Sequence, residues 1–124
     1  MESGGPASGG RLLSELSNAM VALHREHFGR GPGAAKSAVV DDMIICTLTD
    51  VYTPVEKTLI RSGNLERVRE TRQLHQLALA DEFKAEVERI TGRKVTAFVS
   101  SVHFDPDMAI ELFMLEPPEG AAPA

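Results

Sequence analysis

The sequence predicts an α+β fold, a two-layer sandwich in which helices cover an antiparallel sheet made of two hairpins. Apolar residues recur every three or four positions in residues 12–28 and again in residues 65–91, which is the period of a helix with one buried face. Two groups of β-branched and apolar residues, each interrupted by a short turn, are typical of hairpins. Since hairpins place neighbouring strands antiparallel, the predicted order is α-β-β-α-α-β-β.

The chain is long enough for one domain with a single core. It has 124 residues, of which 43% are apolar, an ordinary share for a globular protein. Residues 1–10 and 117–124 consist mostly of Gly, Ser, Ala, Pro and Glu, so we expect two disordered tails. The folded domain is therefore predicted to span residues 11–116.

Composition weighs against several functional classes. The net charge of −5, from 18 acidic and 13 basic residues, disfavours a nucleic-acid binder that must neutralise many phosphates. No apolar run is long enough to cross a bilayer, and the N-terminus lacks the pattern of a secretory signal. With Cys46 as the single cysteine, no intrachain disulfide can form. We expect a soluble cytoplasmic protein.

The first helix and the first hairpin are marked by periodicity and by turn residues. One helical face carries the apolar residues Leu12, Leu16, Ala19, Met20 and Leu23, and Gly29 ends the helix. Strands are expected at residues 38–40 and 43–48, with Asp41 and Asp42 forming the turn between them. A single longer strand is the alternative.

Capping signals predict two consecutive helices after this hairpin. Thr53, Pro54 and Glu56 form the pattern of a capping box with proline in the first turn. Gly63 is expected to end that helix, Asn64 to cap the next one, and Gly92 to end it. The long helix has an apolar stripe made of Leu65, Val68, Leu79, Phe83, Val87 and Ile90. A second hairpin follows, with strands at residues 95–102 and 108–115 around a turn containing Pro106.

Arg72 is the one charge within the apolar stripe of the long helix. An unpaired buried guanidinium is costly, so we expect a carboxylate partner, either Glu56 or Glu111. The alternative is functional, with Arg69, Arg72 and His75 bounding a site for a small anion or for a partner's carboxylate.

Arg30 lies in a loop, Gly29-Arg30-Gly31-Pro32, that has two interpretations. It is either an exposed residue after a helix cap, or part of an anion-binding concavity built from backbone amides. The loop is not a P-loop, because no Gly-Lys-Ser/Thr follows it and no strand precedes it.

The remaining candidates for chemistry have structural explanations. His24 and His27 have a spacing compatible with metal ligands, but no further ligands accompany them, so a surface pair at a helix C-terminus is expected. Cys46 alternates with Ile44 and Leu48 and reads as a core residue. No metal, cofactor or catalytic group is assigned, and an enzyme using His75 or His103 as a base is the least favoured hypothesis.

Leu74 and Leu77 point away from the main stripe of the long helix. They form a second, smaller apolar patch that is either an interface with another molecule or is covered by the first helix of the same chain. Periodicity does not separate these two alternatives.

A set of short motifs follows one order along the chain. They are Arg25-Glu26-His27-Phe28-Gly29-Arg30-Gly31-Pro32, Thr53-Pro54-Val55-Glu56-Lys57-Thr58-Leu59, Arg69-Glu70-Thr71-Arg72, Thr91-Gly92-Arg93-Lys94-Val95 and Phe113-Met114-Leu115-Glu116. In this set the chain resembles the MpsC-like domain family. The likeness covers nearly all of the expected folded region, without the tails.

The resemblance implies a function beside a membrane. The family takes its name from a component of a bacterial sodium-translocating, membrane-potential-generating system, which implies a small non-enzymatic accessory or regulatory subunit at the inner face of the membrane. Its partners would be integral ion-transport subunits, which would carry out any translocation. Arg30, Glu56, Arg69 and Arg72 match motif positions and are interaction-site hypotheses. The rival hypothesis is a homo-oligomeric sensor that binds a small anion at Arg30, Arg69 and Arg72.

Overall fold

The computed structural model describes residues 9–118, so the expected tails lie almost wholly outside the described residues. Within this range the elements follow the predicted order: α1 (Gly9–Phe28), β1 (Ala34–Val40), β2 (Met43–Thr49), α2 (Pro54–Arg61), α3 (Leu65–Thr91), β3 (Val95–His103) and β4 (Met108–Leu115). Helix α1 takes in Gly9 and Gly10, which the sequence pattern had placed in the tail.

The strands form one antiparallel sheet in the order β1-β2-β4-β3. Both predicted hairpins are present, β1 with β2 and β3 with β4, and the pairing of β2 with β4 joins them. The alternative of one long strand is wrong, because Asp41 adopts a positive φ of 55° and turns the chain between β1 and β2. Strand β1 begins at Ala34, earlier than expected, because Ala35 packs against the core. The free edges of the sheet are β1 and β3.

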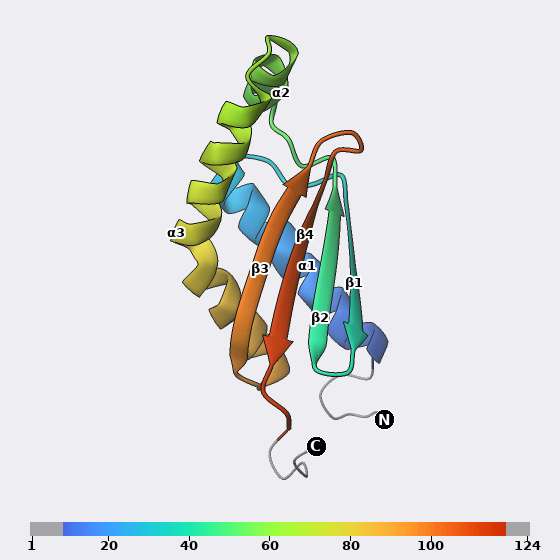
Figure 1. The fold of residues 1–124 in the computed structure, drawn as a ribbon. Helices are drawn as coiled ribbons and strands as arrows, with labels where there is room; N and C mark the ends of the chain where they lie inside the picture. Colours follow the sequence, from blue (N-terminus) through green and yellow to red (C-terminus); the bar gives the residue numbers. More distant parts are fainter. Residues whose placement is uncertain (1–8, 119–124) are drawn as a thin grey trace.

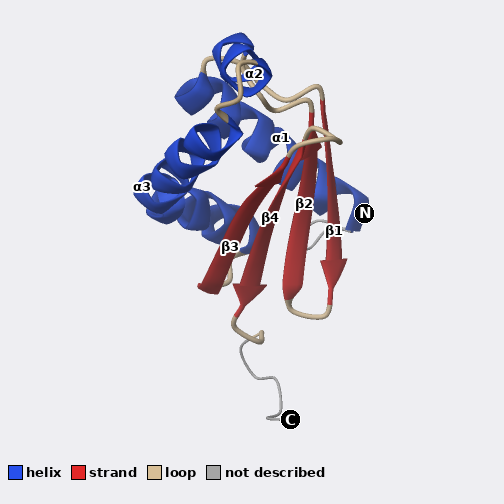
Figure 2. Ribbon diagram, turned by 45° about the horizontal axis from the view of Figure 1, so that its top comes forward, coloured by secondary structure: helices blue, strands red, loops and turns tan. Residues whose placement is uncertain are grey.

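The helices lie on one side of the sheet, and the other side is not covered by the described residues (Figures 1 and 2). Helix α1 packs mainly along β1, and α3 packs along β3. The core lies between these layers, and its fully buried side chains include Leu16, Met20, Ile44, Leu48, Val87 and Phe113. This is the predicted two-layer α+β sandwich.

The helix signals around α2 and α3 are largely confirmed. The Thr53 side chain accepts the backbone N–H of Glu56 and the Glu56 side chain accepts that of Thr53, which is the predicted capping box. Gly63 and Gly92 both have positive φ, at 89° and 71°, as expected for residues that end helices. Asn64 makes no side-chain cap to α3; its amide donates to oxygen atoms of Ser62 instead.

Candidate functional site

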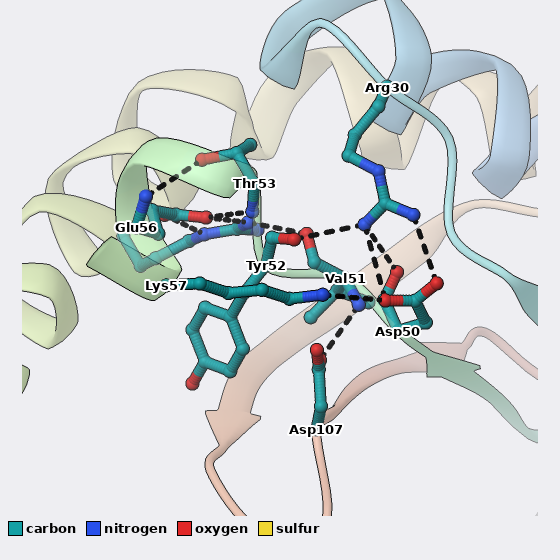
Figure 3. Close-up of polar contacts among 9 residues, drawn as sticks. Arg30, Asp50, Val51, Tyr52, Thr53, Glu56, Lys57 and Asp107 are labelled. Atoms are coloured by element: carbon teal, nitrogen blue, oxygen red, sulfur yellow. Dashed lines mark hydrogen bonds and ion pairs between the residues drawn. The ribbon is translucent and has the colours of Figure 1, made fainter. Parts of the chain in front are cut away.

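The connection between β2 and α2, residues 50–53, is the point where the predicted polar residues converge. Arg72 from α3 and Arg30 from the loop after α1 both donate hydrogen bonds to its backbone carbonyls. Figure 3 shows how the labelled side chains gather around this segment. We call these residues the 50–53 connection.

Arg72 is buried, with 1% of its surface exposed, and it is paired with a carboxylate. Its Nε lies 2.7 Å from Glu56 Oε2 and its Nη2 lies 2.6 Å from Glu56 Oε1, so the contact is bidentate. Nη2 also donates to the Val51 carbonyl at 2.8 Å. The guanidinium carbon lies 4.1 Å from the centroid of the Phe28 ring, a cation–π contact. The prediction of a carboxylate partner is confirmed, and that partner is Glu56.

Glu56 therefore has two functions in the fold. Its carboxylate accepts the Thr53 N–H at 2.8 Å and neutralises Arg72 at the same time. Burial acts to raise the pKa of Glu56, but the hydrogen bonds from Arg72 and from the Thr53 backbone outweigh burial and leave the pKa below its ordinary value. Glu56 is thus held ionised, and it couples the start of α2 to the middle of α3.

Arg30 holds the same connection from the opposite side. Its Nη1 donates to the carbonyls of Asp50 and Tyr52, each at 2.9 Å, and its Nη2 lies 3.0 Å from Asp50 Oδ2. Hydrogen bonds from Arg30 and Lys57 lower the pKa of the Asp50 carboxyl. The expectation of a solvent-exposed Arg30 is wrong. Only 32% of its side chain is accessible, and its guanidinium donates hydrogen bonds to Asp50 and Tyr52.

Asp107, in the turn between β3 and β4, ties the second hairpin to the same connection. Its carboxylate accepts the Val51 N–H at 2.8 Å, and its carbonyl accepts the Asp50 N–H at 3.0 Å. The 50–53 connection is thus fixed by α3, by the loop after α1 and by the β3–β4 turn.

The arginines of the anion-sensor hypothesis are each paired with a different carboxylate. Arg72 contacts Glu56, Arg30 contacts Asp50, and Arg69 lies on the exposed side of α3 with Glu66 at 2.7 Å. His75 is also exposed, with its ring centroid 5.4 Å from that of Phe28. The predicted cluster is therefore corrected to three separate ion pairs, because each guanidinium is closest to a carboxylate of its own.

A row of polar side chains crosses the helix-covered face of the sheet, and sequence reasoning missed it. Ser37, Cys46, Glu111 and Ser100 are consecutive partners across β1, β2, β4 and β3. The Ser37 and Cys46 side chains are 3.2 Å apart, and Ser100 Oγ donates to Glu111 Oε1 at 2.9 Å. We call these four residues the polar row. Its members occupy the phase of each strand that alternation assigns to the core.

Glu111 is the most unusual member of the polar row. It is 3% exposed, and its Oε2 has no hydrogen-bond partner among the described residues. Burial raises the pKa of Glu111 to about 7, although the Ser100 hydrogen bond and the charge of Arg72 act against the rise. A carboxyl group that exchanges its proton near neutral pH therefore lies inside the sandwich.

His24 faces Glu111 from α1. The expectation of a surface pair with His27 is wrong for His24, which is 4% exposed and whose Nδ1 contacts the Met20 carbonyl at 2.9 Å. Its Nε2 lies 3.8 Å from Glu111 Oε1, too far for a hydrogen bond. Burial lowers the pKa of His24, which favours the neutral ring. His24 and Glu111 thus form a close pair of groups that both favour their neutral forms.

These groups border a small cavity between the layers. Its volume is about 10 Å³, roughly the space of one water-sized probe. Its walls include His24, Arg72, Gln76, Ser100 and Glu111. Arg72 and the polar row therefore line the same cavity.

His27 and Cys46 have structural environments. His27 points outward from α1, and its Nε2 lies 3.0 Å from Glu82 on α3 and 3.7 Å from Glu26, so it links the two helices. These three side chains could together offer ligand atoms to a cation, but the hydrogen bond between His27 and Glu82 explains their proximity. Cys46 is fully buried, as predicted, and burial raises the pKa of its thiol to about 11.

Leu74 and Leu77 are 67% and 70% exposed, respectively. The alternative in which α1 covers them is therefore wrong. They stay on the outer side of α3 as an uncovered apolar pair, which we call the α3 leucine pair.

Comparison with known proteins identifies the family of this chain. Residues 8–117 match the model of the family described as MpsC, Na⁺-translocating membrane potential-generating system. The chain belongs to the MpsC family. The match runs from before α1 to beyond β4, so it spans all of the helices and strands described above.

A relative of this chain comes from Bacillus subtilis (strain 168). The protein YbcI, described as uncharacterized, is 29% identical over 92 residues, which are 73% of this chain and 74% of YbcI. A search of solved structures finds none that matches. Within residues 9–118, no helix is both long and apolar enough to cross a membrane.

Proposed function

We propose that this chain is a non-enzymatic accessory subunit of a Na⁺-translocating, membrane potential-generating system. The observation that carries the proposal is the MpsC family match, which spans the whole sandwich rather than a fragment of it. In this proposal the chain acts at the cytoplasmic face, and membrane-embedded partner subunits move the ion. The chain contributes docking or regulation.

The α3 leucine pair is the docking element in this proposal. Leu74 and Leu77 stand on the outer side of the long helix, whose inner side is anchored by buried Val68, Phe83 and Val87. Exposed leucines on a rigid helix can supply the apolar anchors of a helix-in-groove contact. Arg72 cannot contact a partner directly because it is buried, so its contribution is to hold α3 in position.

The anion-sensor alternative is not favoured by the geometry. A shared anion site needs donors that converge on one point, whereas Arg30, Arg69 and Arg72 are each paired with a different carboxylate. An anion would have to displace those carboxylates. We therefore retain the accessory subunit as the single proposed function.

The test is affinity purification of a tagged full chain from mild-detergent extracts of its native cells, followed by mass spectrometry. Wild type should enrich integral ion-transport subunits, and the double variant Leu74→Glu/Leu77→Glu should lose them. The matched control is Val55→Glu on α2, because Val55 is 70% exposed but lies outside the α3 leucine pair. Recovery of the wild-type chain without ion-transport subunits would contradict the proposal. Equal loss of the ion-transport subunits in Val55→Glu would show that the α3 leucine pair is not the docking element.

A further inference from the structure

The side of the sheet that faces away from the helices has an unusual composition. Alternation along the paired strands places four residues of each strand on this side, arranged in four rows across the sheet. The first row is Val40, Met43, Met114 and Ala97, and the second is Ala38, Ile45, Leu112 and Val99. Both rows are apolar from edge to edge. We call this side of the sheet the open face.

The open face is almost free of charge. Its other two rows are Lys36, Thr47, Ile110 and Ser101, followed by Ala34, Thr49, Met108 and His103. Lys36 and His103 are its only ionisable residues, and both lie on the edge strands, β1 and β3. A sheet face that is exposed to solvent normally carries polar residues. The apolar composition of the open face is therefore typical of a covered surface.

Large apolar side chains on the open face remain accessible. Val99 is 57% exposed, Val40 is 51%, Ile110 is 38% and Met114 is 37%. Figures 1 and 2 show that neither α1 nor α3 reaches this side of the sheet. A contiguous apolar patch of this kind on a single molecule marks an interaction site.

We infer that the open face binds the open face of a second copy of this chain, forming a symmetric dimer with two packed sheets. Size supports a second copy as the occupant. Four strands about 4.8 Å apart and eight residues long at about 3.3 Å each give a projected area of roughly 500 Å². Side-chain relief raises the accessible area above this projection, toward the roughly 600 Å² per partner at the low end of specific interfaces.

Charge also supports a second copy. The chain has a net charge of −5, so two copies repel each other through most surfaces, but the strands place no Asp or Glu on the open face. Self-association through this face brings no carboxylates together. A lipid surface would instead favour a ring of several basic residues around the apolar patch, and the open face has one, Lys36.

Two-fold symmetry makes the interface sensitive to single substitutions. Sheets packed face to face cross at a small angle, so the apolar rows of one copy meet those of the other. Each substitution is present twice in a symmetric interface. Val99→Glu would bury two unpaired carboxylates, and we expect it to weaken dimerisation at least about a hundredfold.

The experiment is sedimentation equilibrium of the purified full chain from about 1 to about 200 μM, a range that covers micromolar dimers. Wild type should approach twice the 13.4 kDa of a single chain, and Val99→Glu should stay monomeric. Ala38→Glu is the second variant, because this exposed small residue on the open face removes no packed side chain. The matched control Val55→Glu, on α2 and 70% exposed, should dimerise like wild type.

Circular dichroism and thermal unfolding verify that each variant is folded. Wild type that remains monomeric at the highest concentration would overturn the inference. A dimer that survives both open-face substitutions, or that is lost equally in Val55→Glu, would also overturn it. Because the readout is self-association, it is independent of whether ion-transport subunits are partners.

Discussion

Replacing Glu111 with Gln should stabilise the protein by an amount that grows with pH. The pKa of Glu111 rises from its ordinary 4.5 to about 7 on folding, so the folded state holds this proton more tightly than the unfolded state. Stability contributed by the protonated carboxyl is therefore lost as pH rises from about 4.5 to about 7, and the loss is complete above that range. Gln has nearly the same shape as the protonated acid and does not titrate.

The magnitude follows from the shift. A pKa change from 4.5 to about 7, at about 1.4 kcal/mol per unit, corresponds to about 3 kcal/mol. We therefore expect the free energy of unfolding of Glu111→Gln, relative to that of wild type, to rise by up to about 3 kcal/mol between about pH 4.5 and pH above 7. Amide hydrogen bonding in the variant adds a constant offset and leaves the pH dependence unchanged.

The assay is urea unfolding at constant ionic strength from about pH 4.5 to about pH 8.5, with the difference between variant and wild type plotted against pH. His24 has the opposite sign, because its lowered pKa removes stability as pH falls, and it contributes to both proteins. The difference curve therefore reports the titration of Glu111 together with its coupling to His24, 3.8 Å away. As a control, Glu70→Gln changes the net charge by the same amount at an exposed position of α3. A difference that stays flat across the whole range would refute the reasoning.

Three further predictions concern the fold. Arg72→Ala should lower the free energy of unfolding by about 3–5 kcal/mol, since it leaves the half-buried Glu56 unpaired, while Arg69→Ala on the exposed side should cost less than about 1 kcal/mol in the same urea titrations. Gly92→Ala should cost about 1–2 kcal/mol because φ is 71° there, whereas Gly10→Ala, with open space around it, should cost nothing measurable. Alkylation of Cys46 should be slow in native protein and fast in urea, because the thiol is fully buried with its pKa at about 11; equal rates would contradict this.

Local signals in the sequence predicted the fold because each is decided within a few residues. Thr53 and Glu56 are three positions apart, and their capping box forms from neighbouring atoms alone. The same holds for Gly92, whose backbone conformation ends α3. Asn64 failed as a side-chain cap because its amide contacts Ser62 instead, a competing local hydrogen bond.

The site was predictable only in part, because its contacts depend on which strands become neighbours. Arg72 was recognisable in the sequence as a charge in an apolar stripe, and Glu56 was one of the two carboxylates considered as its partner. Nothing local indicates that β2 pairs with β4, and that pairing alone places Glu111 beside Cys46. Glu111 did leave one signal, since it falls in the buried phase of β4 between Ala109 and Phe113.

Each face of the sheet departs in part from the usual pattern, and this departure connects the two inferences about the sheet. The helix-covered face carries the polar row, while the open face carries two rows that are entirely apolar. Stability of a monomer alone would favour the reverse arrangement, because burying Glu111 costs free energy and exposing Val99 leaves apolar area in water. A sheet covered on both faces, by helices on one side and by a second copy on the other, removes the second cost. The first cost remains, and it makes the interior of the sandwich responsive to pH.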